Sequence, residues 1–294
     1  MAQLFRLPAE LVPKIPEPVR KVIRTTVLGY GRATAPLRPL PDFLILGAQK
    51  AATTALYAYL RWHPGITGPS WKEVSYFDRH YARGEAWYRA NLPALPRHWL
   101  VERRRGRRPL VGEASPSYLF HPLAPERVAA LIPSARLIAV LRNPVDRAFS
   151  HFQHEVAFGR EPLSFEDALD REEERMRGEV ERMIRDPSYF SHAWWNHTYV
   201  ARGRYAEQLE RWFAVFPRAQ LLVLFSEELL ENPAAGYARV LEFLGADRHE
   251  LSSYPRIFAR DYGEMSSVTR ARLEREFAEQ NRQLADLLGR DLPW

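Results

Sequence analysis

The sequence of 294 residues contains no cysteine, so it can form neither a disulfide bond nor a metal site built on thiolates. It also has no run that approaches the roughly 18 consecutive apolar residues of a membrane-spanning helix. Its first residues lack the compact apolar segment of a secretory signal peptide. The lack of an apolar run and of a signal segment predicts no membrane span and no signal peptide. We also predict a cytoplasmic protein.

Lysine is the other scarce residue. Only four of the 42 basic side chains are lysines, at positions 14, 21, 50 and 72, and the remaining ones are arginines. Lysine is a compact point charge that can sit beside a single oxygen atom. Lys50 and Lys72 therefore stand out as candidates for an anion site. The formal charge of +6 favours an anionic ligand or a polyanion, although a mild excess of this size is also common in basic soluble proteins.

Residues 43–60 predict a buried strand, a short turn and a helix. Lys50 lies in the turn, and Thr53 and Thr54 open the helix. The first N–H groups of a helix lack intrahelical partners and the dipole adds positive potential, so the segment suits a phosphate-like anion. It differs from the nucleotide-binding pattern Gly-x-x-x-x-Gly-Lys-Ser/Thr, because Lys50 precedes Thr53 by three positions and the second glycine is missing. The alternative is a buried strand–turn–helix with a solvated lysine.

Apolar strands alternate with helices along the rest of the chain. Further strands are predicted at 110–113, 136–141 and 221–225, helices at 52–62, 125–131, 204–216, 234–244 and 266–288, and a charged helical excursion at 164–186. This order predicts an α/β protein with three layers, α/β/α, around a central parallel sheet. We assign residues 42–294 to this domain. We predict that residues 1–41 form a basic, proline-punctuated extension with one short helix near 19–28. Three alternatives stay open for this extension: packing on the domain, disorder, or contact with an anionic membrane.

Two more groups of residues could take part in the same chemistry. Ligands bind at the carboxyl ends of strands in such folds, and Arg142 follows the strand at 136–141. Arg142 and Ser150, two turns into the next helix, suit a second phosphate. Alternatively, Arg142 pairs with Asp146 and Ser150 is a surface residue. Glu73 could act as a base toward an incoming hydroxyl or amine, although taken alone it fits a solvated loop residue.

These motifs follow one another as Gly-x-Gln-Lys-x-x-Thr-Thr, then Lys-Glu-x-x-Tyr-Phe, then Leu-Arg-Asn-Pro-x-x-Arg-Ala-x-Ser. Together they resemble the sulfotransferase family. Within it they resemble the carbohydrate type, which is similar to heparan sulfate N- and O-sulfotransferases. We expect the chain to be a bacterial member of the family. The resemblance runs from residue 42 to 294 and includes segments 112–118, 203–217 and 243–245. It implies the P-loop-NTPase-like sulfotransferase fold. It also implies transfer of a sulfuryl group from 3′-phosphoadenosine 5′-phosphosulfate (PAPS) to a hydroxyl or amine, with a carbohydrate as the expected acceptor and PAP as the product.

The resemblance also implies a role for each site residue. Lys50 is the implied catalytic lysine and Glu73 the implied catalytic base. The implied contacts to PAPS are Gln49, Lys50, Ala51, Ala52, Thr53 and Thr54 around the 5′-phosphosulfate, and Arg142, Ser150 and Arg260 around the 3′-phosphate. Lys50 and the N–H groups of the loop can stabilise the charge that develops on the leaving phosphate, so no metal is required.

Three departures from the family pattern stand out. Ala114 occupies the position where many relatives have a lysine in a Glu-Lys-Ser/Thr-Pro motif, so a second active-site lysine is missing. The chain has no cysteine for the disulfide loop that animal relatives often carry near the C-terminus. Their Lys-Gly-Arg-x-Tyr-Pro segment, which covers the nucleotide, is matched only in part by residues 258–263.

The acceptor site is predicted from aromatic residues. Trp194 and Trp195 are neighbours, so they cannot share one face of a helix or strand. One can therefore belong to the core while the other offers a flat platform to a sugar ring or a hydrophobic acceptor. The alternative is that both pack the 164–186 excursion onto the domain. Lys72, Ser115 and Tyr118 complete the candidate acceptor contacts.

Two other functions stay open. A kinase-like phosphate-loop enzyme would need a serine or threonine directly after Lys50, where Ala51 stands. A nucleic-acid-binding protein is suggested by the basic charge and the arginine-rich run at 103–108. A solvated basic loop explains this run better, and we expect no nucleic-acid partner. Two histidine pairs, His151 with His154 and His192 with His197, have no carboxylate at a matching spacing, so we expect no metal site.

Overall fold

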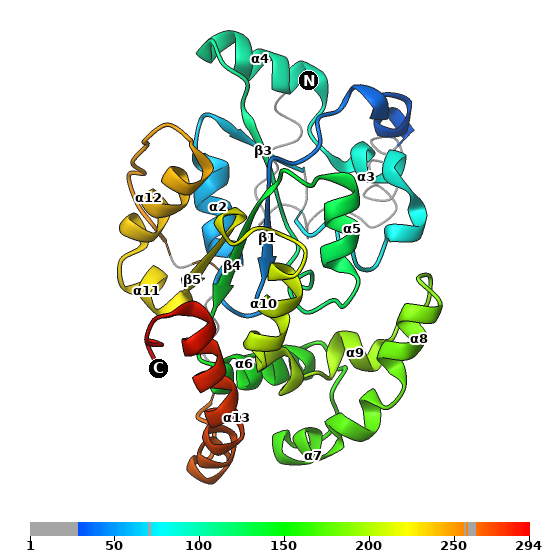
Figure 1. Ribbon diagram of the computed structural model, residues 1–294, viewed down its shortest axis with the longest axis vertical. Helices are drawn as coiled ribbons and strands as arrows, with labels where there is room; N and C mark the ends of the chain where they lie inside the picture. The colour runs from blue at the N-terminus through cyan, green and yellow to red at the C-terminus, as the bar shows by residue number, and fades with distance from the viewer. Residues whose placement is uncertain (1–28, 70–71, 256, 258–262) are drawn as a thin grey trace.

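The computed structural model describes residues 29–69, 72–255, 257 and 263–294. The helix predicted near 19–28 and Arg260 lie outside these ranges. Five strands form one sheet in the order β2-β3-β1-β4-β5, and every neighbouring pair is parallel (Figure 1). The bounds are β1 Phe43–Gly47, β2 Ile66–Thr67, β3 Leu110–Ala114, β4 Arg136–Leu141 and β5 Leu221–Phe225. The predicted α/β class and parallel sheet are confirmed.

β1 is the central strand, and its position fixes the position of the site. Leu44 lies beside Glu113 of β3, and Ile45 lies beside Ile138 of β4. All five residues of β1 are buried. A parallel strand that is covered on both faces appears in the sequence as a continuous apolar run, which is why this strand was predictable. Because β1 and β4 are parallel neighbours, the segments that follow them emerge side by side.

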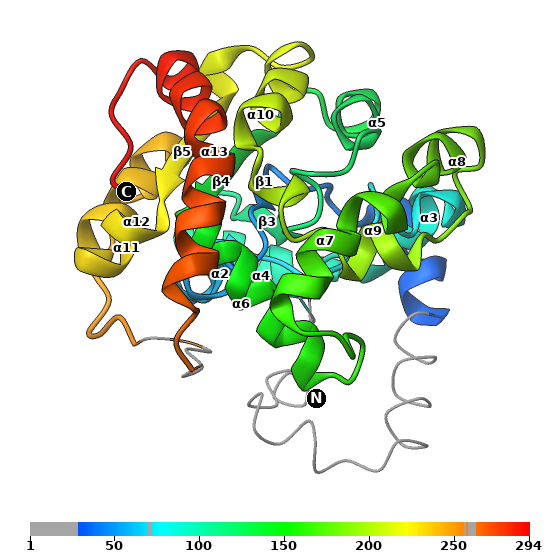
Figure 2. The same cartoon turned by 90° about the horizontal axis from the view of Figure 1, so that it is seen from below.

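Helices cover both faces of this sheet. Their bounds are α2 Thr53–Trp62, α3 Glu85–Asn91, α4 Leu95–Arg105, α5 Ala124–Leu131, α6 Pro144–Ala157, α7 Phe165–Met176, α8 Glu179–Arg185, α9 His192–Asn196, α10 Tyr205–Phe213, α11 Ser226–Glu231, α12 Pro233–Leu244 and α13 Ser267–Leu288. Short 3₁₀ turns cover η2 Ala35–Leu37, η3 Tyr81–Arg83, η4 Ala201–Gly203 and η5 Arg218–Gln220. Figure 2 shows α5 and α10 on one side of the sheet and α2 on the other, so the three-layer arrangement is confirmed.

Several helix ends follow from local chemistry. α6 begins at Pro144, which suits a first helical position because proline has no N–H group to satisfy. The Asn143 side chain caps this end by accepting a hydrogen bond from the Val145 N–H at 2.9 Å. Ser164 caps α7 by accepting from the Asp167 N–H at 3.1 Å. α13 ends at Gly289, whose φ of 64° is favourable for a residue without a Cβ atom.

Some segments differ from the sequence prediction, and the N-terminal extension follows one of its stated alternatives. Residues 103–105 belong to α4 and are helical rather than part of a loop, and the aromatic segment around Trp194 forms the short helix α9. Arg38, in the region assigned to the N-terminal extension, is buried and donates to the carbonyl oxygens of Ala90 and Leu92 at 3.2 and 2.5 Å. The described end of that extension therefore packs against α3. Within the described ranges, no helix combines the length and the apolarity needed to cross a bilayer.

Candidate functional site

The loop between β1 and α2 forms the candidate anion site. Lys50 and Ala52 adopt left-handed conformations, with φ values of 70° and 60°. Ala52 is the residue before α2, and no side chain caps this end of the helix. The first N–H groups of α2 therefore stay available for a ligand, which is the arrangement that binds phosphate-like anions. Lys50 lies in this loop, and Thr53 and Thr54 are the first two residues of the helix.

Arg142 lies beside this loop, as the parallel strands require. The Arg142 Nη1 atom donates to the Lys50 carbonyl oxygen at 3.1 Å, which ties the end of β4 to the β1–α2 loop. Asp146 pairs with Arg270 at 2.7 Å, and no Arg142–Asp146 pair is found among the described residues. Ser150 is buried on α6 rather than exposed, so the alternative of a surface residue is wrong.

Lys72 brings the Glu73 segment to the start of α2. Its Nζ atom donates to the Thr54 Oγ1 atom at 2.6 Å and lies 3.5 Å from the Glu73 carboxylate. Burial lowers the pKa of Lys72, and nearby Lys50 lowers it further, while Glu73 raises it. The Glu73 side chain is 46% exposed, so it can meet a molecule that approaches from solvent. The structure thus brings Lys50, Thr54, Lys72 and Glu73 into one neighbourhood.

The donor set fits an anionic nucleotide. An uncapped helix start, one lysine, two threonine hydroxyls and an arginine all offer positive charge or hydrogen-bond donors. The buried Gln49 Oε1 atom has no hydrogen-bond partner in the structure. This atom can therefore accept a hydrogen bond from an N–H or O–H group of a ligand. Within the described ranges, no three histidine, aspartate or glutamate side chains cluster in a way that could hold a metal. Arg260, predicted for the 3′-phosphate, lies outside the described residues.

Glu113 is a buried carboxyl group that the sequence analysis did not single out. Its Oε2 atom accepts from the Tyr88 hydroxyl at 2.8 Å, and its Oε1 atom accepts from the Ser115 hydroxyl at 2.5 Å and the Tyr118 hydroxyl at 3.0 Å. Burial raises the pKa of Glu113 to about 7, although the three hydrogen bonds oppose this shift. Ser115 and Tyr118 are fully buried and already bonded. In this structure neither is placed for the acceptor contact predicted for it.

The two tryptophans divide as their adjacency predicted. Trp194 is buried, with its ring stacked 5.0 Å from that of Phe120, so it belongs to the core. Trp195 is half-buried and lies 5.8 Å from Phe190, which is 41% exposed. The Arg79 guanidinium lies 4.5 Å from the Phe190 ring centre and 5.7 Å from that of Trp195. Of the two tryptophans, Trp195 is partly exposed and Trp194 is not.

The arginine run at 103–108 is largely paired within the protein. Arg105 and Arg107 both pair with Asp247, and Arg108 pairs with Asp42. The Arg103 guanidinium lies 5.3 Å from the ring centre of Trp99. The side chains of Arg107 and Arg108 stay 50% exposed despite these ion pairs.

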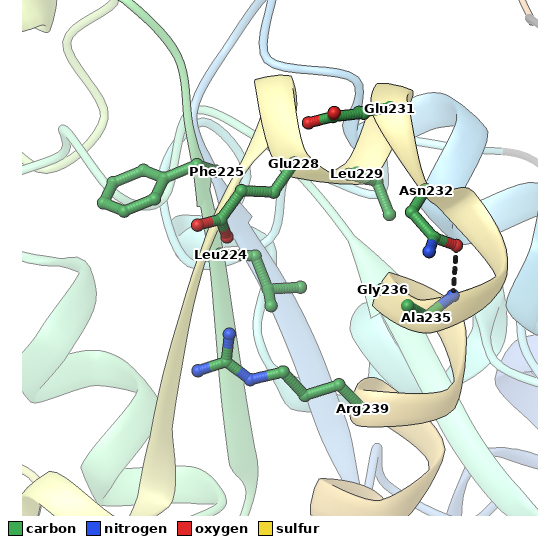
Figure 3. Close-up of a pocket in the computed structure, with 9 residues that line it drawn as sticks. All are labelled: Leu224, Phe225, Glu228, Leu229, Glu231, Asn232, Ala235, Gly236 and Arg239. Carbon is green, nitrogen blue, oxygen red and sulfur yellow. Dashed lines mark hydrogen bonds between the residues drawn. The ribbon is translucent and has the colours of Figure 1, made fainter. Parts of the chain in front are cut away.

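A pocket of about 480 Å³ lies between β5, α11 and α12. Figure 3 shows Glu228 and Arg239 on either side of Leu224 in this pocket. Glu228 also pairs with Arg290 at 2.5 Å. None of the site residues predicted from the sequence lines the pocket, so we assign it no role in the candidate site.

Comparison with known proteins identifies relatives of the chain. Residues 40–270 match the family model described as the sulfotransferase domain. Heparan sulfate glucosamine 3-O-sulfotransferase 6 from Mus musculus is 33% identical over 244 residues, which are 83% of this chain and 63% of that protein. Bifunctional heparan sulfate N-deacetylase/N-sulfotransferase 2 from Homo sapiens is 33% identical over 212 residues, which are 70% of this chain but only 22% of that protein.

A solved structure resembles the whole domain. The crystal structure of a sulfotransferase from Alicyclobacillus acidocaldarius is 34% identical to this chain and superposes with a TM-score of 0.64. The match covers 86% of this chain and 98% of that one. The similarity therefore extends over the sheet and both helical layers rather than over the anion loop alone.

Proposed function

The chain belongs to the sulfotransferase family, and from that premise we propose that it moves the sulfuryl group of PAPS to a hydroxyl or amine of a carbohydrate. One observation carries the proposal. Lys50 lies in the loop before α2, and no side chain caps the start of that helix. Lys72 connects the same helix start to Glu73. An anion-binding loop and a carboxylate that can take a proton are the two parts that sulfuryl transfer needs.

The transfer step places each group in a defined role. The acceptor oxygen or nitrogen attacks sulfur while the bond from sulfur to the 5′-phosphate oxygen breaks, and the electron pair stays on that oxygen. Glu73 takes the proton that the acceptor loses, a role typically worth about 10²–10⁴-fold in rate. Lys50 and the first N–H groups of α2 stabilise the charge on the leaving phosphate, and each such donor is typically worth about 10²–10³-fold.

Thr54 and Arg142 both keep hydrogen-bond donors available for the nucleotide. Thr54 accepts a hydrogen bond from Lys72, so its own hydroxyl proton stays free for donation to a phosphate oxygen. Arg142 uses one Nη1 contact to hold the Lys50 carbonyl, and a guanidinium has further N–H donors for a 3′-phosphate. Ser150 would add a hydroxyl donor from α6.

Binding of PAP, the desulfated product, separates this proposal from its rivals. We expect calorimetry to show PAP binding in the presence of a magnesium chelator and at moderate salt, with much weaker binding of adenosine 5′-monophosphate. Binding that requires magnesium would favour the kinase-like alternative. Binding of DNA or RNA without binding of PAP would favour the nucleic-acid alternative, and either result would overturn the proposal.

A carbohydrate acceptor is proposed because both curated relatives are named for action on heparan sulfate. A PAPS-dependent assay against saccharides with free amines, saccharides with only free hydroxyls, lipids and phenols tests it. Transfer to phenols or lipids alone would contradict the carbohydrate acceptor. The cytoplasmic location, the boundary at residue 42 and a membrane contact by residues 1–41 stay predictions.

A further inference from the structure

We propose that Glu113 is a positioning residue that fixes the backbone of the Glu73 segment through the hydroxyl groups of Ser115 and Tyr118. The inference rests on the proposed function, because it assigns Glu73 the role of base. It concerns Glu113, Ser115 and Tyr118, which are all buried. Ser115 and Tyr118, predicted from the sequence to contact the acceptor, here bind the backbone of the segment that carries Glu73.

Glu113 is anchored by the sheet and surrounded by hydroxyl groups. It lies in β3, in register with Leu44 of the central strand. Its side chain is 1% exposed, and it accepts from Tyr88 of α3 as well as from Ser115 and Tyr118. A carboxylate has only acceptor sites, so all three hydroxyl protons must point toward it. The orientation of each hydroxyl group is thereby set.

Two of these hydroxyl groups then bind the backbone of the catalytic segment. The Ser75 N–H donates to the Ser115 hydroxyl oxygen at 3.0 Å, and the Tyr76 N–H donates to the Tyr118 hydroxyl oxygen at 2.8 Å. Since each hydroxyl proton is committed to Glu113, its oxygen lone pairs face these amides. Two consecutive residues, starting two positions after Glu73, are therefore held against β3.

The conformation of the segment shows why it needs such support. Ser75 is a buried residue with a side chain, yet its φ is 51°, a left-handed value that residues other than glycine seldom adopt. Strained backbone of this kind persists only where surrounding contacts hold it, and it is common at functional sites. The Tyr76 ring adds a second contact, stacked 4.4 Å from that of Tyr88 with an interplanar angle of 8°. Glu113, Tyr88 and the segment are thus joined by a continuous set of contacts.

Glu113 and the hydroxyl groups of Ser115 and Tyr118 together form a hydrogen-bonded relay to the Glu73 segment. The test compares variants of this relay with a matched control. Glu113→Gln keeps the shape but introduces an amide donor, while Ser115→Ala and Tyr118→Phe each remove a single hydroxyl group. Tyr199→Phe is the control, because the buried Tyr199 hydroxyl donates to Glu161 at 2.8 Å, a contact of the same kind outside the relay. Assays at pH 8.5 keep Glu113 ionised in the wild type, since its pKa is about 7.

We expect each relay variant to lower kcat at least tenfold while the KM for PAPS stays within about twofold. Hydrogen exchange measured by mass spectrometry should show faster exchange of the 72–77 segment, relative to β4, in the relay variants and not in Tyr199→Phe. Relay variants that lose thermal stability as Tyr199→Phe does, yet keep wild-type kcat or wild-type exchange in 72–77, would overturn the inference.

The two readouts also separate this inference from the proposed function. If the wild-type protein shows no PAPS-dependent transfer, the proposed function fails while the exchange measurement still tests whether Glu113 holds the segment. If the wild type is active and the variants exchange normally, the inference fails and the proposed function stands.

Discussion

The contact between Lys72 and Thr54 allows the geometry of the site to be tested by a double-mutant cycle. Lys72→Met removes the ammonium group but keeps most of the apolar stem, and Thr54→Val removes the hydroxyl group at nearly constant volume. The Lys72 Nζ atom lies 2.6 Å from Thr54 Oγ1, and the Lys72 side chain is only 19% exposed. A hydrogen bond to a charged group typically contributes about 1.5–3 kcal/mol. The ion pair to Glu73 adds little, because that carboxylate is half exposed and such pairs are worth roughly 0–1 kcal/mol.

We therefore expect each single variant to lower kcat/KM for PAPS, and the double variant to lose less than the product of the two. The coupling should be about 1–2 kcal/mol, which is roughly a 5- to 30-fold departure from additivity. Thr53→Val combined with Lys72→Met is the matched control, because no Lys72–Thr53 hydrogen bond forms among the described contacts, and this pair should be close to additive. Additivity of the Lys72–Thr54 pair, or equal coupling in the control, would refute the arrangement.

Three further predictions address the nucleotide, the acceptor and the buried carboxyl group. Arg142→Ala and Ser150→Ala should weaken PAP much more than adenosine 5′-phosphosulfate, which lacks the 3′-phosphate; equal losses in calorimetry would show that the pair does not bind this phosphate. Trp195→Ala should raise the KM for the acceptor with little change in melting temperature, whereas Trp194→Ala should mainly lower the melting temperature, because Trp194 is buried; the reverse pattern would place the acceptor elsewhere. The pKa of Glu113 is raised by burial to about 7 from 4.5. The raised pKa of Glu113 therefore contributes roughly 3 kcal/mol to the free energy of unfolding. This contribution is fully present below about pH 4.5 and is lost as pH rises through about 7. Denaturant unfolding should show that Glu113→Gln removes most of this pH dependence, and an unchanged dependence would contradict the assignment.

The sheet and the anion loop were predictable because their signals are local. The strands β1, β4 and β5 are continuous apolar runs, and a turn with Lys50 followed by two threonines suits an anion wherever it occurs. Parallel pairing then required the segments after β1 and β4 to lie side by side, and the Arg142–Lys50 contact confirms this expectation.

The contacts of the 72–77 segment could not be predicted, because this stretch has no periodic pattern and its position depends on tertiary packing. The sequence therefore gave no sign that Lys72 would reach Thr54. Ser115 and Tyr118 follow a strand directly, and their positions alone do not tell which side of the chain they face. Glu113 did leave a signal that was missed: a single carboxylate in a strand that is otherwise apolar and buried by its neighbours must find hydrogen-bond partners.

The most direct measurement is PAPS-dependent transfer by the wild type and by Lys50→Ala, with PAP binding and melting temperature measured on the same samples. The account predicts that Lys50→Ala folds, still binds PAP, though more weakly, and loses about 10²–10³-fold in kcat, because the leaving phosphate loses a stabilising cation. A folded Lys50→Ala protein that transfers the sulfuryl group at the wild-type rate would contradict the central claim that this loop carries the reaction.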